Sequence, residues 1–429
     1  MRVKLAYGRA GMTVNMPDNR TTIIEPLFMP SIPDEAASVE HALRHPIRSR
    51  PLREVISSTD TVAVVFCDIT RPMPSSLVLP IVLQHLDHVP REQIVLICAT
   101  GTHRANTKEE LEQMLGADIV CDYRIVCHDG ADRSTQTMVG RLDDGTEVWL
   151  SSELVKAGKV VLTGFIEPHF FAGFSGGPKM IAPGCAANDT ILSLHSAKLI
   201  ADPKATWGVT DGNPLWEKIC QAARFVDVAF NLNVTINKRH QVTNVFAGEM
   251  WQSHRIGVEF ARKTAMRGVS QAFDVVVTTN AGYPLDMNLY QTVKGMSAAA
   301  QIVRPGGVIV VASECSDGIP EHGNFKKLLR QAGSPDALLA MLTQPDFAMQ
   351  DQWEAQILAQ VLKKARVYLK AGFLSDQQIR DSMLTPINSV EDCVNEVLEE
   401  MGPNATVGVL PQGPFTIPFI QAREPLAIA

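Results

Sequence analysis

The sequence lacks the long apolar segments of membrane-spanning or exported proteins. No stretch of about 18 residues is free of charged or turn-forming residues, and the N-terminal MRVKLAYGRAGMTVNMP contains no apolar run of signal-peptide length. A basic excess is also missing, because 39 Lys and Arg face 46 Asp and Glu and the net charge is -7. That balance argues against a nucleic-acid-binding surface. We therefore expect a cytoplasmic protein that acts on small molecules, without a nucleic-acid or membrane partner.

The eight cysteines are scattered along the chain, and no disulfide framework is implied. Several of the eight cysteines lie in apolar runs such as VVFC and VLIC, which is typical of buried thiols in a reducing compartment. Cys121, Cys127 and His128 come nearest to a metal-binding group. The five residues between the two cysteines and the missing second ligand pair favour structural roles over a zinc site.

The sequence does contain strand-like and helix-like segments in alternation, as in an α/β protein. The hydrophobic fraction of 45% and the charged fraction of 20% are those of a globular protein. With 429 residues, the chain is longer than a domain with a single hydrophobic core, which indicates two domains. Short β-branched runs alternate with helical patterns, which predicts mostly parallel sheets flanked by helices. The predicted strands cover 61–67, 93–100, 159–165, 226–234, 273–279, 306–313, 366–370 and a last segment near 405–410.

The predicted helices connect these strands and divide the chain into two series. They cover 74–89, 107–116, 213–226, 285–303 and 352–365. Thr107 and Glu110 have the spacing of a capping box. Because the pattern restarts at Phe273 after a plausible connector at 266–272, we predict domains at 1–268 and 269–429, with the active site in an interdomain cleft.

Polar residues directly after strands are the first functional candidates, because ligands of open α/β sheets bind beyond the carboxyl ends of strands. Asp68 and Arg71 follow the first strand, and Arg71 could pair with a carboxylate or phosphate. Alternatively, Asp68 caps the next helix and pairs with Arg71. His103 follows the second strand, where a lone histidine is often structural.

The third strand end is the most unusual stretch of the chain. Its glycines and Ser175 allow backbone N–H groups to approach an anion, and Lys179 adds a positive charge. The stretch fits neither the P-loop, because Pro178 and Met180 occupy two of that motif's defining positions, nor the dinucleotide fingerprint. The candidates here are His169, Ser175, Gly176, Gly177 and Lys179, with His195 in the following helical segment. Together with His103, they suggest a nucleotide-like cofactor beside proton-transferring histidines.

A further cluster lies in the second domain. Tyr290 and Lys294 share one face of a predicted helix, and Gln291 lies beside it. All three could line a binding site. An amphipathic helix with a solvated Lys294 is the alternative.

Five motifs together resemble the nickel-dependent lactate racemase family, in order and spacing and over most of the chain. They are CDITRPMPS, ATGTHR, GFIEPHFFAGFSGGPKMIAPG with His195 downstream, AGYPLDMNLYQTVKGM and QDQW. The resemblance implies a racemase or epimerase of small 2-hydroxy acids that uses pyridinium-3,5-bisthiocarboxylic acid mononucleotide, the nickel-pincer nucleotide. It also implies transient contact with the enzymes that synthesise this cofactor.

The resemblance assigns roles to the candidate residues. His195 is implied as the nickel ligand and Lys179 as the residue linked to the cofactor, with Ser175, Gly176 and Gly177 around its phosphate. His103 and His169 are the implied bases that accept the hydroxyl proton while the α-hydride passes to the cofactor, giving a 2-keto acid. The implied substrate residues are Arg71 and Lys294 at the carboxylate, Asp68 orienting Arg71, and Tyr290, Gln291 and Trp353 lining the pocket.

One departure from the family pattern lies beside the proposed link. Pro178 stands where the lactate-specific members have arginine, and proline removes both a cation and a backbone donor. A bound and a covalently linked cofactor therefore both remain open. Two other functions also remain open, namely a nucleotide-dependent oxidoreductase of 2-hydroxy acids and a non-catalytic cofactor carrier.

Overall fold

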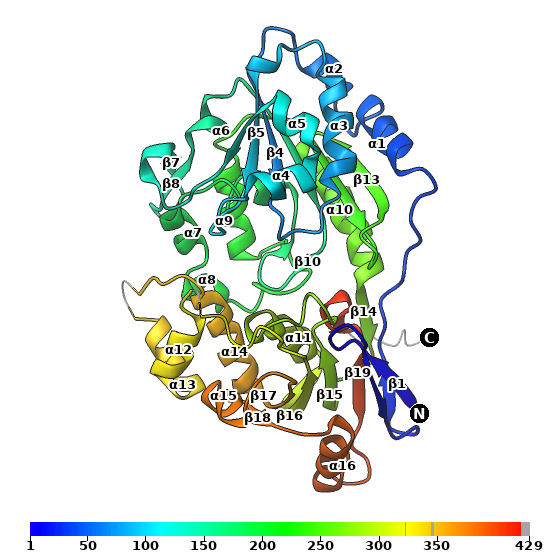
Figure 1. Ribbon diagram of the computed structural model, residues 1–429. Helices are drawn as coiled ribbons and strands as arrows, with labels where there is room; N and C mark the ends of the chain where they lie inside the picture. Colours follow the sequence, from blue (N-terminus) through cyan, green and yellow to red (C-terminus); the bar gives the residue numbers. More distant parts are fainter. Residues whose placement is uncertain (322, 345–346, 422–429) are drawn as a thin grey trace, which may run out of the picture. The chain divides into compact units, whose positions relative to one another are not determined.

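The computed structural model describes residues 1–321, 323–344 and 347–421, which form two compact units (Figure 1). The unit called central here comprises Phe28–His195 and Lys204–Thr264. The unit called terminal comprises Met1–Leu27, Ser196–Pro203 and the chain from Ala265 onward. The first 27 residues thus join the same unit as the C-terminal part of the chain.

The central unit is built on a six-stranded sheet of order β13-β12-β9-β4-β5-β6. Its strands are β4 (Val62–Cys67), β5 (Ile94–Ala99), β6 (Arg124–Cys127), β9 (Lys159–Phe165), β12 (Val228–Ile236) and β13 (Val242–Gly248). Neighbours run parallel except at the edge, where β13 is antiparallel to β12. Every residue of β4 is buried, as expected for a strand covered on both faces.

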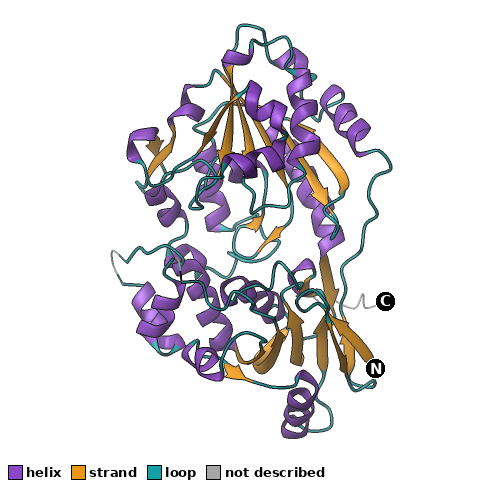
Figure 2. Ribbon diagram, viewed as in Figure 1, coloured by secondary structure: helices purple, strands orange, loops and turns teal. Residues whose placement is uncertain are grey.

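Helices surround this sheet, and two hairpins extend from it (Figure 2). The helices are α1 (Glu35–Arg44), α2 (Leu52–Val55), α3 (Ser75–His85), α4 (Lys108–Leu115), α5 (Ala117–Asp122), α6 (Ser152–Lys156), α7 (Asn188–Leu194), α9 (Pro214–Ala223) and α10 (Met250–Ala265). The hairpins are β7 (Gln136–Arg141) with β8 (Glu147–Ser151), and β10 (Pro168–His169) with β11 (Gly173–Phe174). Short 3-10 turns are η1 (Arg91–Gln93), η2 (Arg133–Thr135) and η3 (Gly177–Met180). The predicted capping box of α4 is confirmed, since Thr107 and Glu110 exchange both hydrogen bonds.

The terminal unit contains a second six-stranded sheet, of order β18-β17-β16-β15-β19-β3 and parallel throughout. Its strands are β3 (Thr21–Ile23), β15 (Phe273–Thr279), β16 (Val303–Ala312), β17 (Ala365–Lys370), β18 (Thr385–Pro386) and β19 (Val407–Leu410). A hairpin of β1 (Arg2–Leu5) and β2 (Met12–Asn15) packs on this sheet, and a separate parallel pair joins β14 (Met266–Val269) to β20 (Ile417–Ile420). The segment expected as a connector therefore contains a strand.

Seven helices and one 3-10 turn belong to the described part of the terminal unit. They are α8 (Ala197–Ile200), α11 (Leu289–Ala300), α12 (Phe325–Ala332), α13 (Pro335–Leu342), α14 (Gln352–Lys364), α15 (Asp376–Asp381), α16 (Val390–Met401) and η4 (Gly413–Phe415). The α/β fold class, with mostly parallel sheets flanked by helices, is confirmed.

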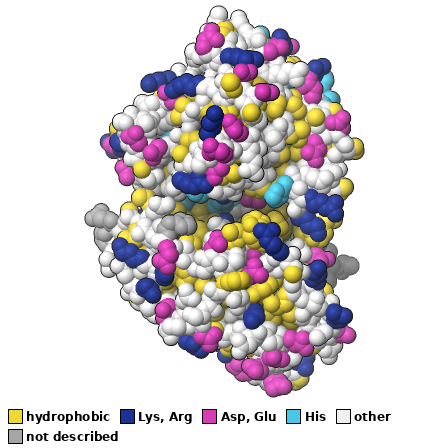
Figure 3. Space-filling model, in the orientation of Figure 1, with side chains coloured by type: hydrophobic (Ala, Val, Ile, Leu, Met, Phe, Trp, Pro, Cys, Tyr) yellow, Lys and Arg dark blue, Asp and Glu magenta, His cyan; other side chains and the backbone are white. Residues whose placement is uncertain are grey.

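The surface agrees with the acidic, mixed-sign composition. On the face shown in Figure 3, cationic and anionic side chains are interspersed rather than segregated. No helix among the described residues is long and apolar enough to cross a bilayer.

Candidate active site

Asp68 and His103 come from neighbouring strands and meet at one edge of the central sheet. Asp68 directly follows β4 and His103 follows β5, and these strands are parallel, so both chains leave the sheet at the same end. Oδ2 of Asp68 lies 2.8 Å from Nδ1 of His103, and the Thr70 hydroxyl donates to Oδ1 of Asp68 at 2.9 Å. The structure thus joins residues from two separate sequence motifs.

This contact determines the tautomer of the neutral His103 ring. Burial acts to raise the pKa of Asp68, but the hydrogen bond and charge of His103 and the charge of Arg71 together hold this pKa below its usual value. The ionised carboxylate accepts the Nδ1–H of His103, which leaves the lone pair of the neutral ring on Nε2. With 38% of its side chain exposed, His103 can act as a general base.

Arg71 lies in the turn between β4 and α3. Its backbone N–H donates to the Asp68 carbonyl at 3.1 Å, and its side chain is exposed. Helix α3 begins after Pro74, with no side-chain cap. The alternative in which Asp68 caps this helix is therefore wrong, because the Asp68 carboxylate is engaged by Thr70 and His103.

His169 lies in the small β10–β11 hairpin that follows β9. It pairs with Gly173 in the hairpin, and its Nδ1 accepts from the Ala172 backbone N–H at 3.3 Å. A neutral ring that accepts at Nδ1 carries its proton on Nε2. His169 and His103 are therefore held with opposite ring nitrogens protonated.

The ring of Phe171 brings three candidates of the central unit together. Its centroid lies 4.5 Å from that of His169 and 5.1 Å from that of His195, which stands perpendicular to it. Nζ of Lys179 lies 5.8 Å from the same centroid. The hairpin, α7 and η3 thus converge on one aromatic side chain.

His195 ends helix α7 and is only 5% exposed. Its Nδ1–H donates to the Ile191 carbonyl at 2.8 Å, so the lone pair of the neutral ring is on Nε2. Burial lowers the pKa of His195 to about 4, and the charge of Lys179 acts in the same direction. His195 is therefore neutral at physiological pH, as a metal-binding imidazole must be.

A row of buried amides holds the loop that contains Lys179. The Gly177 N–H donates to Oδ1 of Asn233 at 3.1 Å. Asn233 in turn donates to Asn231 at 2.8 Å, and Asn231 donates to the Ser253 hydroxyl at 2.9 Å. All three supporting side chains are fully buried, so strand β12 and helix α10 fix the position of Gly177.

His254 supports the same loop from α10. Its Nε2 lies 2.8 Å from the Ser175 carbonyl oxygen, and the ring of Trp216 stacks on it at 5.3 Å. A Cβ at Gly177, where φ is +50°, would lie 2.7 Å from His254 Cδ2. Position 177 therefore requires glycine both for its φ and for its close approach to His254. The Ser175 hydroxyl donates within its own loop, to the Phe165 carbonyl at 2.9 Å.

The remaining candidates lie on two packed helices of the terminal unit. Nε1 of Trp353 on α14 donates to the Tyr290 hydroxyl on α11 at 3.0 Å. One turn further along α11, Nζ of Lys294 donates to Oε1 of Gln291 at 2.7 Å. The structure thus brings the four predicted residues together as two hydrogen-bonded pairs.

Comparison with known proteins identifies the family to which this chain belongs. A protein of Thermoanaerobacterium thermosaccharolyticum named lactate racemase is 33% identical over 416 residues, which cover 96% of this chain and 97% of the relative. The chain belongs to the lactate racemase family. Residues 7–208 match the family's N-terminal domain and residues 269–417 its C-terminal domain.

Two further likenesses agree with the family. The lactate racemase of Lactiplantibacillus plantarum is 33% identical over 88% of this chain and 90% of its own length. The solved lactate racemase apoprotein from T. thermosaccharolyticum superposes with a TM-score of 0.91 at 32% identity, covering 97% of this chain and all of that one. A Thermotoga maritima protein, with a TM-score of 0.68 at 18% identity over 92% of this chain and all of that one, shares the fold.

The donor atoms around His195 bear on the cofactor that the family resemblance implies. Within the described residues, no three His, Cys, Asp or Glu side chains are grouped so that they could hold a metal ion. The neutral ring of His195, with its lone pair on Nε2, is a donor of the kind that nickel accepts and fits the role that the resemblance implies for it. All eight cysteines are free thiols, and five are buried. His128, one of the three weaker zinc candidates, is buried with Nε2 at the Ala186 carbonyl.

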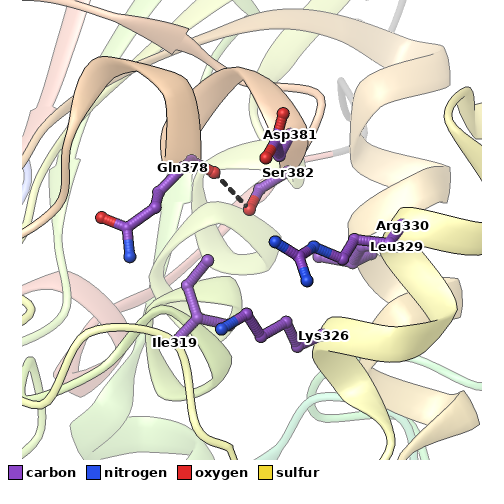
Figure 4. Close-up of a pocket in the computed structure, with 7 residues that line it drawn as sticks. All are labelled: Ile319, Lys326, Leu329, Arg330, Gln378, Asp381 and Ser382. Carbon is purple, nitrogen blue, oxygen red and sulfur yellow. Dashed lines mark hydrogen bonds between the residues drawn. The ribbon is translucent and has the colours of Figure 1, made fainter.

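One pocket lies apart from these residues, between α12 and α15 of the terminal unit. Figure 4 shows two cationic side chains, Lys326 and Arg330, opposite Gln378 and Ser382. Lys326 is paired with Glu321. None of the predicted site residues lines this pocket.

Sequence reasoning missed the residues that support the site. Phe171 lies in the motif GFIEPHFFAGFSGGPKMIAPG, but two adjacent phenylalanines give no sign of which one contacts the histidines. Asn233 and His254 lie in a strand and a helix far along the chain, and their partners are backbone groups of the loop. The alternation of asparagines with apolar residues in β12 was the one available signal, because polar residues in a buried strand need partners.

Proposed function

We propose that this chain is a racemase of lactate or a similarly short 2-hydroxy acid, acting with a nickel-pincer nucleotide. Two relatives named lactate racemase, each 33% identical to the chain, support this function. The observation that carries it is the opposite state of two imidazoles in the central unit. His103 is held by Asp68 with Nε2 as acceptor, and His169 is held by Ala172 with Nε2 as donor.

Two such imidazoles suit a reaction that inverts one carbon. When the hydroxyl proton of one enantiomer passes to His103 and the α-hydrogen leaves as hydride, the substrate becomes a planar 2-keto acid. Return of the hydride to the opposite face requires a proton from the other side, which His169 is set to donate. The reverse reaction exchanges the two roles.

The cofactor roles fall to the loop and to α7. Lys179 would provide a covalent link if one forms, His195 would be the metal ligand, and Ser175, Gly176 and Gly177 would hold the phosphate. When bound, the nucleotide would supply a pyridinium carbon that accepts and returns the hydride, with nickel held beside it. The Ser175 hydroxyl donates to the Phe165 carbonyl and the Gly177 N–H donates to Asn233. A phosphate bound at these two donors would replace those internal hydrogen bonds.

The substrate roles fall to charged and aromatic side chains. Lys294 and Arg71 provide positive charge for the carboxylate. Gln291 holds the Lys294 ammonium at 2.7 Å, and the bonded pair of Tyr290 and Trp353 limits the room for the substrate side chain. Asp68 is proposed to act on Arg71 by charge and on His103 by its hydrogen bond.

The test is racemisation by protein produced together with the cofactor-synthesis enzymes and nickel. Single enantiomers of lactate, malate, 2-hydroxybutyrate and gluconate are incubated, and chiral chromatography follows the products. We expect inversion without added NAD, and loss of inversion with retained nickel in His103→Gln and His169→Gln. Inversion that requires NAD would indicate an oxidoreductase instead, and stoichiometric nickel without inversion of any acid would indicate a cofactor carrier.

A further inference from the structure

Cys98 and Cys127 are two thiols of the central unit to which the proposed reaction assigns no role. They lie directly opposite each other in the parallel strands β5 and β6. Neighbouring strands lie about 4.8 Å apart, and the Cα atoms of disulfide-bonded cysteines are about 4.4–6.8 Å apart. The pairing of the two strands therefore gives these cysteines a backbone spacing that a disulfide bond can bridge.

Contacts with Asn106 place both thiols on the same face of the sheet. Sγ of Cys98 donates to Oδ1 of Asn106 at 3.3 Å, and Sγ of Cys127 donates to the Asn106 carbonyl oxygen at 3.9 Å. One residue thus contacts both sulfur atoms. Because β6 is the last strand of this sheet, it can adjust towards β5 without disturbing another strand pair.

The two thiols differ in acidity and in access to solvent. A Cys98 S–H turned towards Cys127 is the main cause that lowers the pKa of Cys127 to about 7, whereas burial and the charges of nearby carboxylates oppose this shift. The same interaction raises the pKa of Cys98 well above its usual value. Cys127 is partly exposed, and Cys98 is buried. The Cys127 thiolate is therefore the group that reacts first with an oxidant.

We propose that Cys98 and Cys127 form a reversible disulfide bond by exchange with a low-molecular-weight disulfide such as oxidised glutathione. The Cys127 thiolate attacks one sulfur of the oxidant, whose S–S bond breaks and releases a small thiolate. The Cys98 thiol loses its proton to solvent, attacks the Cys127 sulfur and displaces the second small thiolate. Two protein thiols are thereby oxidised by two electrons, and one small disulfide is reduced to two thiols.

The bond changes the loop between β5 and α4, which contains His103. Its formation removes both S–H groups and therefore both hydrogen bonds to Asn106. Asn106 also donates to Glu110 at 3.3 Å, and Glu110 closes the capping box at the start of α4. Oxidation thus loosens the loop and slows racemisation. This effect on racemisation rests on the proposed function, whereas the disulfide itself does not.

Peptide mapping by mass spectrometry tests the bond. The full chain, loaded with cofactor and nickel, is equilibrated with mixtures of oxidised and reduced glutathione, alkylated and digested without reductant. We expect a cross-link between the peptides of Cys98 and Cys127 that dithiothreitol removes. Cys98→Ser should instead carry one glutathione on Cys127, because the second thiol is missing. Cys121→Ser, which removes an exposed thiol on α5, is the matched control and should keep the cross-link.

Hydrogen exchange tests the effect on the loop without depending on turnover. Amides 100–107 should exchange faster in the oxidised wild type than in the reduced one. Racemisation should fall by about tenfold or more, because small displacements of a catalytic group can cost up to about 100-fold. Cys127→Ser, treated in the same way, should keep its exchange rates and its activity, which separates the effect of the bond from oxidation of the cofactor. Circular dichroism verifies that the variants are folded.

Two results would overturn the proposal. One is the absence of a cross-link between Cys98 and Cys127 in a folded sample in which exposed Cys121 has reacted with glutathione. The other is a cross-link that leaves hydrogen exchange at 100–107 unchanged. A failure of the proposed function would instead appear as absent racemisation in the reduced protein as well, while the cross-link and the exchange rates still report on the disulfide.

Discussion

At the scale of single residues, the site depends on which nitrogen of each histidine is occupied by the protein. Asp68 holds His103, Ala172 holds His169 and Ile191 holds His195, and all three contacts are made at Nδ1. Asp68 and Ile191 accept a hydrogen bond from their histidine, whereas the Ala172 N–H donates one. One residue type could therefore supply the base, the acid and the metal ligand of the proposed reaction.

The contact between Asp68 and His103 can be tested by Asp68→Asn. The amide fits the same space but cannot stabilise a protonated imidazole by charge, so kcat/KM should fall by about 100-fold or more. The fall should be equal for the two enantiomers, because mirror-image acids have equal free energies. Thr70→Val, which removes only the hydroxyl bonded to Asp68, should cost far less. Wild-type rates in Asp68→Asn with unchanged nickel content would contradict the role of Asp68.

Buried His254 predicts a loss of stability in acid. Burial lowers its pKa to about 4 from the ordinary 6.5, so the unfolded chain binds a proton more readily than the folded one. Stability is therefore complete above about pH 6.5 and falls as the pH drops towards 4, by up to roughly 3 kcal/mol from this residue. The thermal unfolding midpoint should fall less between pH 7 and pH 4.5 in His254→Gln than in the wild type. Equal falls would show that His254 does not titrate in this way.

At the scale of elements, short irregular segments position the chemistry and regular elements hold these segments in place. The loop with Lys179 is joined to β12 through Asn233 and to α10 through His254. Both elements are regular and buried on the relevant face. The loop can therefore present unusual backbone angles at Gly176 and Gly177 without losing its position.

Gly177→Ala tests this support. The added Cβ would lie 2.7 Å from His254 Cδ2 at a φ of +50°, so the loop must move away from α10. We expect less cofactor bound, and less Lys179 carrying added mass if the link is covalent, as measured by native and intact mass spectrometry. Gly145→Ala provides the control, because its φ is +85° but nothing lies within 4 Å of the added Cβ. Equal loading of the two variants would contradict the proposed support.

At the scale of the whole molecule, the two units are assembled from segments distant in sequence. Strand β3 pairs with β19, and the β1–β2 hairpin contributes Val3, Leu5, Val14 and Met16 to the core of the terminal unit. Parallel pairing and core packing hold the first residues of the chain there, because a sheet edge and an apolar face must both be covered.

Leu5→Ala should therefore destabilise the terminal unit, although it lies at the other end of the chain. Leu5 is fully buried, and truncation of such a residue costs about 2–5 kcal/mol. Hydrogen exchange should quicken in β15, β16 and β19, whereas the strands of the central sheet should exchange as in the wild type. Exposed Lys4, on the same strand, offers Lys4→Ala as a control with little effect. Faster exchange only in the central sheet would contradict this assignment.

Much of the fold followed from local pattern. The strands at 159–165 and 273–279 match their predicted bounds. The strand predicted at 61–67 begins one residue later, and the strand predicted at 93–100 is one residue shorter at each end. This agreement arises because continuous β-branched runs are a strong signal of buried parallel strands. Strands β3, β14 and β20 escaped prediction because each is only three or four residues long. Such strands are stable only through partners that the sequence does not identify.

The sequence by itself determined the fold class, the family and the residue types at the site, since these depend on composition, periodicity and motif order along the chain. Tertiary structure decided that Asp68 contacts His103 and that Phe171 joins His169, His195 and Lys179. The physical reason is that hydrogen bonds and charges act over a few ångströms in space, whereas these partners are separated by many residues in sequence.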